Sequence, residues 1–147
     1  MSKIWENECL WIPIITWFLV QTIKVVVDIS QNKKLDVKRW WGSGGMPSSH
    51  SAFVCSLATA IGLTEGMDSP LFALAFCFAS VVMYDASGVR RAAGKQARIL
   101  NQIIESEGKN INVQEKLIEL LGHTPLEVYV GAVIGIMMSI IFVPIWS

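Results

Sequence analysis

Two short segments combine a histidine and hydroxyl side chains with a proline. Histidine can attack a phosphate, and hydroxyl groups can bind one. The first is GGMPSSHSA at residues 44–52, where His50 falls in the first turn of an expected helix. The second is GHTPLEV at residues 122–128, where His123 stands just before the N-cap. Hydroxyl residues and proline mark helix N-termini, whose free backbone N–H groups favour an anion. The sequence therefore predicts two histidine-bearing helix N-termini that could receive a phosphate.

Other side chains are candidates for phosphate binding or for support of such a site. Glycine at position 45 frees the backbone to approach an anion closely. Lys24 belongs to a polar stripe on an otherwise apolar segment, and polar groups inside a membrane bundle are costly enough to suggest a site. Asp85 is expected to pair with a nearby arginine and hold it in position. The candidate phosphate-binding residues are Ser48, Ser49, Lys24, Arg39, Arg90, Arg91 and Lys95.

The elements that must position these residues are membrane helices. Of 147 residues, 52% are hydrophobic and 16% are charged, which excludes an ordinary soluble domain. The apolar runs 9–27 and 126–146 are each long enough to cross a bilayer. Shorter runs at 52–64 and 71–84 flank a turn and predict a helical hairpin. We expect a single all-α integral membrane domain over residues 1–147, a polytopic bundle with about four transmembrane helices.

The long connection before the last apolar run predicts two amphipathic helices. One follows an apolar stripe and ends near Gly108, while the second has Asn112 as N-cap and ends at Gly122. Both are expected to lie along the membrane surface. The stripe of the first consists of Ala93, Ala97, Leu100 and Ile104, and its polar side of Arg91, Lys95, Arg98 and Gln102.

Charge is distributed unevenly between the two expected faces of the membrane. Ten lysines and arginines lie in the connections between the first and second and between the third and fourth apolar runs, whereas the opposite face carries only Lys3. The positive-inside rule then places both connections in the cytoplasm and both termini outside, in an inner membrane. Gly131, Gly135 and Ser139 form a small-residue stripe for close packing, within the chain or between copies, and a homodimer is expected. We expect no nucleic-acid partner.

The segment GGMPSSHSA, together with YDASGVRRAAGKQARILN at residues 84–101, resembles the divergent type-2 phosphatidic acid phosphatase family. That family is related to acid phosphatases and vanadium haloperoxidases. The resemblance implies that His123 attacks phosphorus to form a phosphohistidine, that His50 protonates the departing alkoxide, and that Glu127 orients His123. It implies no metal or other cofactor.

The chain departs from the motifs of the wider superfamily. The arginine six residues before the nucleophile falls on Leu117, and the serine before it falls on Lys116. Arg39 resembles a remnant of the first motif, Lys-x6-Arg-Pro, but Trp40 follows it. Arg90, Arg91 and Lys95 are therefore the expected replacements for the missing cations.

The leading hypothesis is a metal-independent phosphatase that acts on a lipid phosphate such as phosphatidic acid or phosphatidylglycerophosphate. One alternative is a non-enzymatic membrane protein that binds or translocates anionic lipids; another is a metal-dependent hydrolase that uses Asp85 and Glu127. Each candidate also has a purely structural interpretation. His50 could be an interfacial helix residue and His123 a polar hinge, while Thr124 and Glu127 have the spacing of a capping box.

Overall fold

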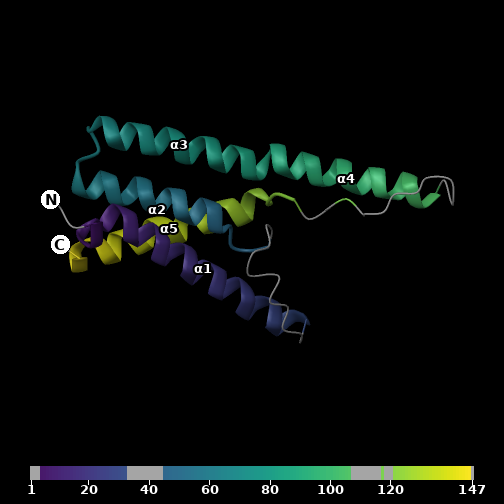
Figure 1. Ribbon diagram of the computed structural model, residues 1–147, viewed down its shortest axis with the longest axis horizontal. Helices are drawn as coiled ribbons and strands as arrows, with labels where there is room; N and C mark the ends of the chain where they lie inside the picture. Colours follow the sequence, from purple (N-terminus) through teal and green to yellow (C-terminus); the bar gives the residue numbers. More distant parts are fainter. Residues whose placement is uncertain (1–3, 33–44, 107–116, 118–120, 147) are drawn as a thin grey trace.

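The computed structural model describes residues 4–32, 45–106, 117 and 121–146, and every regular element in them is helical. After a short 3-10 helix come five α-helices, shown along the chain in Figure 1. Their bounds are η1 Ile4–Glu6, α1 Glu8–Asn32, α2 Ser49–Thr64, α3 Pro70–Ser87, α4 Val89–Ser106 and α5 Pro125–Trp146.

Three stretches are long and apolar enough to cross a membrane: Glu8–Ile29, Pro70–Ser106 and Pro125–Trp146. The fourth apolar helix, α2, is shorter at 16 residues. The predicted all-α membrane bundle is confirmed, with three helices of spanning length and a short apolar one. At 1.5 Å per residue α2 is about 24 Å long, less than the roughly 30 Å of a hydrocarbon core.

Helix α2 lies at the centre of the bundle, where it contacts α1, α3 and α5. Nine of its residues are buried. An apolar cluster of small side chains joins it to α3, built from Val54, Cys55, Ala58, Ala75 and Ala79. The helices α1, α3 and α5 surround α2, so little of its backbone faces lipid although the helix is short.

The small-residue stripe of α5 packs against α2 of the same chain. A Cβ added at Gly131 would collide with the carbonyl oxygen of Ser48, and one at Gly135 with that of Ala52. Ser139 donates a hydrogen bond to the carbonyl oxygen of Ser56 at 2.7 Å. The stripe is therefore used inside the chain, so it no longer argues for self-association, which stays a prediction.

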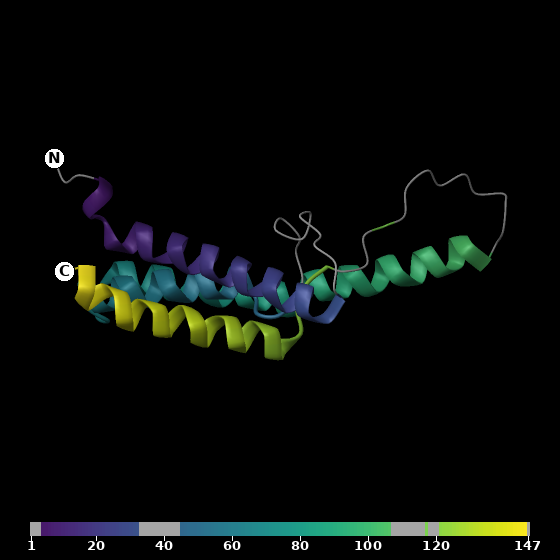
Figure 2. The ribbon, with the colours of Figure 1, turned by 90° about the horizontal axis from the view of Figure 1, so that it is seen from below.

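The two ends of the bundle differ in what they carry. The two termini and the turn between α2 and α3 lie at one end, whereas the beginnings of α2 and α5 and the end of α3 lie at the other (Figures 1 and 2). This arrangement agrees with the prediction that both termini share one side. Which side of the membrane that is stays a prediction.

Helix α4 differs in direction from the expected surface helix. It begins at Val89, directly after Gly88, and both views show it continuing along the axis of α3 beyond the bundle (Figures 1 and 2). Only Gly88 separates the two helices: its N–H donates to the carbonyl of Tyr84 in the last turn of α3, and its carbonyl accepts from Ala92 N–H in the first turn of α4, both at 2.9 Å.

Most of the second expected amphipathic helix, with its N-cap Asn112, lies outside the described residues. Leu117 and Leu121 are described, and neither is helical. The side chain of Asn101 binds both backbone groups of Leu117, donating to its carbonyl at 2.9 Å and accepting from its N–H at 3.1 Å. A buried side chain of α4 thus takes the backbone groups that a helix would have used.

Candidate active site

The two predicted helix N-termini meet at one end of the bundle. Ser48 is the N-cap of α2, and its hydroxyl accepts a hydrogen bond from Ser51 N–H at 3.3 Å. With this cap, α2 begins at Ser49, three residues before the apolar run that starts at residue 52. His50 therefore lies in the first turn of α2, as predicted. Ser48 N–H donates to the carbonyl of Glu127 at 3.0 Å, which ties the start of α2 to the first turn of α5.

His123 is held through both its backbone and its side chain. Its backbone N–H donates to the carbonyl of Ala86 at the end of α3, at 2.9 Å. Its side chain is 3% exposed, and Nδ1 lies 3.1 Å from Oε2 of Glu127. Because an ionised carboxylate only accepts hydrogen bonds, this contact favours the tautomer with the proton on Nδ1. Nε2 then keeps a free lone pair, which is the form a nucleophile requires.

The same oxygen of Glu127 also completes a capping box. Thr124 N–H donates to Oε2 of Glu127 at 3.0 Å, and Glu127 N–H donates to the hydroxyl of Thr124 at 3.4 Å. The expected capping box is present, and the contact with His123 exists beside it. One carboxylate therefore starts α5 and orients the imidazole.

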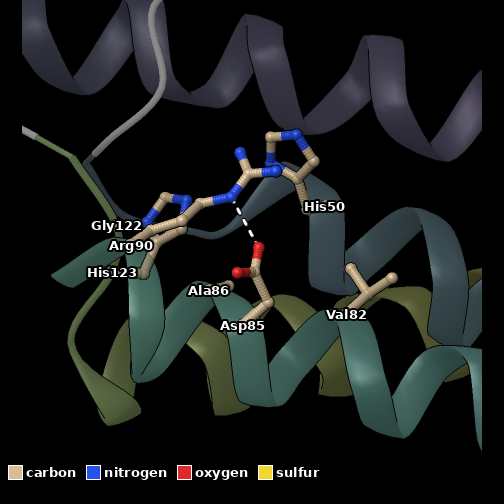
Figure 3. A pocket seen from close by; sticks show the side chains of 7 residues that line it. All are labelled: His50, Val82, Asp85, Ala86, Arg90, Gly122 and His123. Carbon is tan, nitrogen blue, oxygen red and sulfur yellow. Dashed lines mark hydrogen bonds and ion pairs between the residues drawn. The ribbon is translucent and has the colours of Figure 1, made fainter. Parts of the chain in front are cut away.

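A small pocket opens between the two histidines (Figure 3). The ring centroids of His50 and His123 are 6.5 Å apart. Both rings line the pocket, as a nucleophile and a proton donor on either side of a phosphoryl group require. The lining residues are His50, Val82, Asp85, Ala86, Arg90, Gly122 and His123.

Arg90 supplies the positive charge of the pocket. Its Nε donates to Oδ2 of Asp85 at 2.6 Å, an ion pair drawn as the dashed line in Figure 3. Because Nε takes the carboxylate, the two terminal nitrogens keep donors for an oxyanion. The supporting contact expected of Asp85 is present, and it is made with Arg90.

Arg91 and Lys95 are not among the residues that line the pocket. The backbone of Arg91 lies against Gly122, whose φ of 82° brings the two segments too close for a Cβ. Lys95 is exposed one turn further along α4. Arg90 faces the pocket and Arg91 does not because of the way α4 is rotated about its own axis. The short junction with α3 fixes that rotation.

The remaining candidates lie around the pocket or outside the described residues. Lys24 reaches the site from α1, where its Nζ donates to the hydroxyl of Ser49 at 3.2 Å. Gly45 adopts a φ of 81° before α2, with no atom within 4 Å of an added Cβ. The hydroxyl of Ser48 accepts a hydrogen bond from that of Ser51 at 3.0 Å. Arg39 lies outside the described residues.

Burial lowers the pKa of His123 below its ordinary value of 6.5, while the hydrogen bond with Glu127 opposes this shift. The positive charges of Lys24 and Arg90 act in the same direction as burial. Imidazole is therefore neutral at neutral pH, as an attack on phosphorus requires.

Val82, Ala86 and Gly122 belong to the pocket but were not predicted as site residues. Val82 lies one helical turn before Asp85, so the 3.6-residue repeat of α3 would have placed it on the same face. No sequence signal indicates that the carbonyl of Ala86 meets His123. Within the described parts of the chain, no three or more His, Cys, Asp or Glu side chains are grouped so that they could hold a metal ion.

Comparisons with known proteins agree with the architecture. A family model described as "Divergent PAP2 family" matches residues 5–138. The chain is 41% identical over 133 residues to an uncharacterized membrane protein, YuiD, from Bacillus subtilis (strain 168), a match that covers 82% of this chain and 84% of that protein. No solved structure matches.

Proposed function

The chain belongs to the divergent PAP2 family of membrane proteins, and on that premise we propose that it is a metal-independent lipid phosphate phosphatase. The observation that carries the proposal is the buried imidazole of His123, with Nδ1 on Glu127 and His50 across the pocket. A lone pair on Nε2, a second imidazole and an arginine are the groups that phosphoryl transfer through histidine needs.

The proposed reaction has two steps. In the first, Nε2 of His123 attacks phosphorus, the bond from phosphorus to the alcohol oxygen breaks, and His50 gives that oxygen a proton. In the second, His50 takes a proton from water, whose oxygen attacks the phosphohistidine and releases inorganic phosphate. Both histidines return to their starting protonation states, so the cycle consumes one water for each monoester.

The charges around the pocket suit a phosphate dianion. Arg90 presents its terminal nitrogens, and Lys24 at Ser49 supplies a second positive charge near His123. These two cations take the place of the arginine and lysine missing from the wider superfamily motifs. Lys95 is not part of this proposed cradle, and Arg91 takes part only through its backbone.

The proposed substrate is a phosphate monoester on a lipid in the cytoplasmic leaflet. The pocket opens at the end of the bundle where α2 and α5 begin, and the positive charge of the sequence segments that precede these two helices predicts a cytoplasmic position. Phosphatidic acid and phosphatidylglycerophosphate are the first candidates. A homodimer remains an expectation with no support from the small-residue stripe.

The decisive test is phosphate release from a panel of lipid phosphates in detergent micelles that contain a chelator. We expect release by the wild type, a loss to background in His123→Gln, and unchanged binding of His123→Gln to vesicles with phosphatidic acid. Binding without release by the wild type would favour the alternative of an anionic-lipid binder. Release that stops only with chelator would favour a metal-dependent hydrolase.

A matched pair of arginine variants tests the cradle. Arg90→Gln removes the guanidinium that lines the pocket, whereas Arg91→Gln removes its neighbour of the same charge. We expect a much larger fall in kcat/KM for Arg90→Gln, because a charge-assisted hydrogen bond to the transition state is worth about 1.5–3 kcal/mol. Equal losses would mean that only the overall charge matters.

A further inference from the structure

Helix α4 carries exposed apolar side chains away from the bundle. Ile99 is 57% exposed, and Leu100 and Ile103 are each 48% exposed. With Val89 and Ala92, which are also exposed, they form a strip along one side of the helix, which we call the α4 strip; exposed Gln96 lies on the same side between Ala92 and Ile99. Large exposed apolar side chains at helical spacing are typical of a surface that another apolar phase covers.

The other sides of α4 have different chemistry. Gly94, Ala97 and Asn101 are buried on one side. Arg91, Lys95 and Arg98 follow each other at spacings of four and three residues, which puts them on one row beside the α4 strip. A strip of aliphatic side chains bordered by a basic row is the pattern of a helix at an anionic membrane surface.

The α4 strip continues the lipid-facing side of α3. Leu74, Phe78 and Val81 are exposed on α3, at the spacing that leads through Asp85 to Val89. A single residue, Gly88, separates the two helices, and α4 continues along the axis of α3, so the strip on α4 follows the exposed side of α3. The strip is interrupted at Asp85, level with the pocket, and resumes on α4.

The length of this continuous helix places α4 outside the hydrocarbon. Residues Pro70–Ser106 form 37 residues of helix, about 55 Å, against roughly 30 Å of hydrocarbon. If α3 crosses the core, α4 begins at the headgroups, at the end that holds the pocket, and a straight helix of about 55 Å would carry its last turns beyond a bilayer of roughly 40–45 Å with its headgroups. At Gly88 the backbone departs from helical values, with ψ of −84°, so a bend there would bring the strip to the surface.

We propose that α4 is an interfacial helix whose strip inserts at the headgroup level of an anionic leaflet while Arg91, Lys95 and Arg98 contact lipid phosphates. The proposal does not depend on phosphatase activity. The occupant is an anionic lipid surface because the basic row complements it and because the strip is continuous with the lipid-facing side of α3.

Two adjacent positions test the proposal. Ile103→Cys lies on the strip and Gln102→Cys beside the basic row, each in a protein whose Cys9, Cys55 and Cys77 are replaced by serine. An environment-sensitive fluorophore is attached to each variant in vesicles of phosphatidylcholine with or without phosphatidylglycerol. We expect a blue shift and quenching by spin-labelled lipids at position 103, larger with phosphatidylglycerol, and a solvent-exposed signal at position 102. Lys95→Gln with Arg98→Gln should abolish the dependence on phosphatidylglycerol.

Three other results would overturn the proposal. Identical solvent-exposed signals at both positions would mean that α4 projects into water. Shielding at position 103 that spin-labelled lipids do not quench would mean that protein, including a second copy, covers the strip. Equal shielding with and without phosphatidylglycerol would remove the role of the basic row.

Hydrogen exchange checks the same point without labels, in the protein with its native cysteines. We expect the backbone amides of residues 95–106 to exchange more slowly in nanodiscs with phosphatidylglycerol than in nanodiscs without it. Equal exchange in the two kinds of nanodisc contradicts the proposal.

Discussion

Each proposed catalytic side chain depends on a neighbour for its chemical state. Glu127 selects the tautomer of His123, and Asp85 directs the guanidinium of Arg90. His50 lines the same pocket from the first turn of α2, where the charges of Arg90 and Asp85 act on its imidazole. At the scale of the residue, the predictions therefore concern proton positions more than binding.

The role of His50 is tested by changing the leaving group. His50→Gln should slow hydrolysis of a lipid phosphate by about 10²- to 10⁴-fold, the usual contribution of a general acid. Hydrolysis of 4-nitrophenyl phosphate should fall much less, because nitrophenolate departs without a proton. Steady-state rates on both substrates give the comparison. Equal losses would assign His50 a role other than proton donation.

The acidic side of the pH profile reports on His123. Since burial lowers the pKa of His123, the neutral nucleophile persists below pH 6.5, and the acid limb of kcat/KM should lie below that value. The hydrogen bond with Glu127 raises the pKa, so Glu127→Gln should move the acid limb to still lower pH while the maximal rate falls. A limb that moves to higher pH in this variant contradicts the assignment.

At the scale of elements, the site depends on the junction between α3 and α4 and on the chain that enters α5. Gly122 lies against the backbone of Arg90 and Arg91, and His123 then binds the carbonyl of Ala86. The end of α3 and the start of α5 are thereby joined through main-chain contacts. A change at Gly122 should affect the pocket more than the bundle.

Two glycines with positive φ provide a matched comparison. Alanine at either Gly45 or Gly122 pays about 1–2 kcal/mol for the left-handed backbone. At Gly122 the new Cβ would also meet the backbone of Arg91, whereas at Gly45 it meets nothing within 4 Å. We expect Gly122→Ala to lose most activity with its helix content retained, and Gly45→Ala to keep most of it. Activity and circular dichroism of both variants check this, and similar activities would contradict the close approach.

At the scale of the whole molecule, a short central helix is enclosed by longer ones, and the chemistry is confined to one end. Both termini and the turn between α2 and α3 occupy the opposite end (Figure 1). In the sequence, most lysines and arginines lie in the segments that precede α2 and α5, the two helices that begin at the pocket end. The orientation of the protein in the membrane therefore also decides on which side of the membrane the pocket lies.

Topology is tested with single cysteines at the two ends, in a background without native cysteines. Met67 lies exposed in the turn between α2 and α3, and Gln102 lies exposed on α4, away from the α4 strip. In intact cells, a membrane-impermeant thiol reagent should label Met67→Cys and leave Gln102→Cys unlabelled until the cells are lysed. Labelling of Gln102→Cys alone would place the pocket outside the cytoplasm and reverse the predicted orientation.

Local patterns in the sequence were sufficient for the four apolar helices and for the start of α5. The apolar runs indicated the helices, Thr124 before Pro125 indicated the N-cap of α5, and the hydroxyl residues after Pro47 indicated that His50 lies in the first turn of α2. Caps and apolar runs depend on groups within one or two turns of each other, so sequence spacing alone determines them. The capping box of α5 is the clearest case.

The assembly of the pocket was decided only by the tertiary structure. Ser48 meets Glu127, and Ala86 meets His123, across long separations in sequence that no local pattern encodes. Arg90 rather than Arg91 lines the pocket because the rotation of α4 depends on its junction with α3. The glycine stripe could have served either packing within the chain or association between copies, and it packs on α2 because only the folded chain presents that backbone to it. The sequence by itself determined which residues stand at helix ends, and the packing of α2 against α5 and α3 decided which of them face one another.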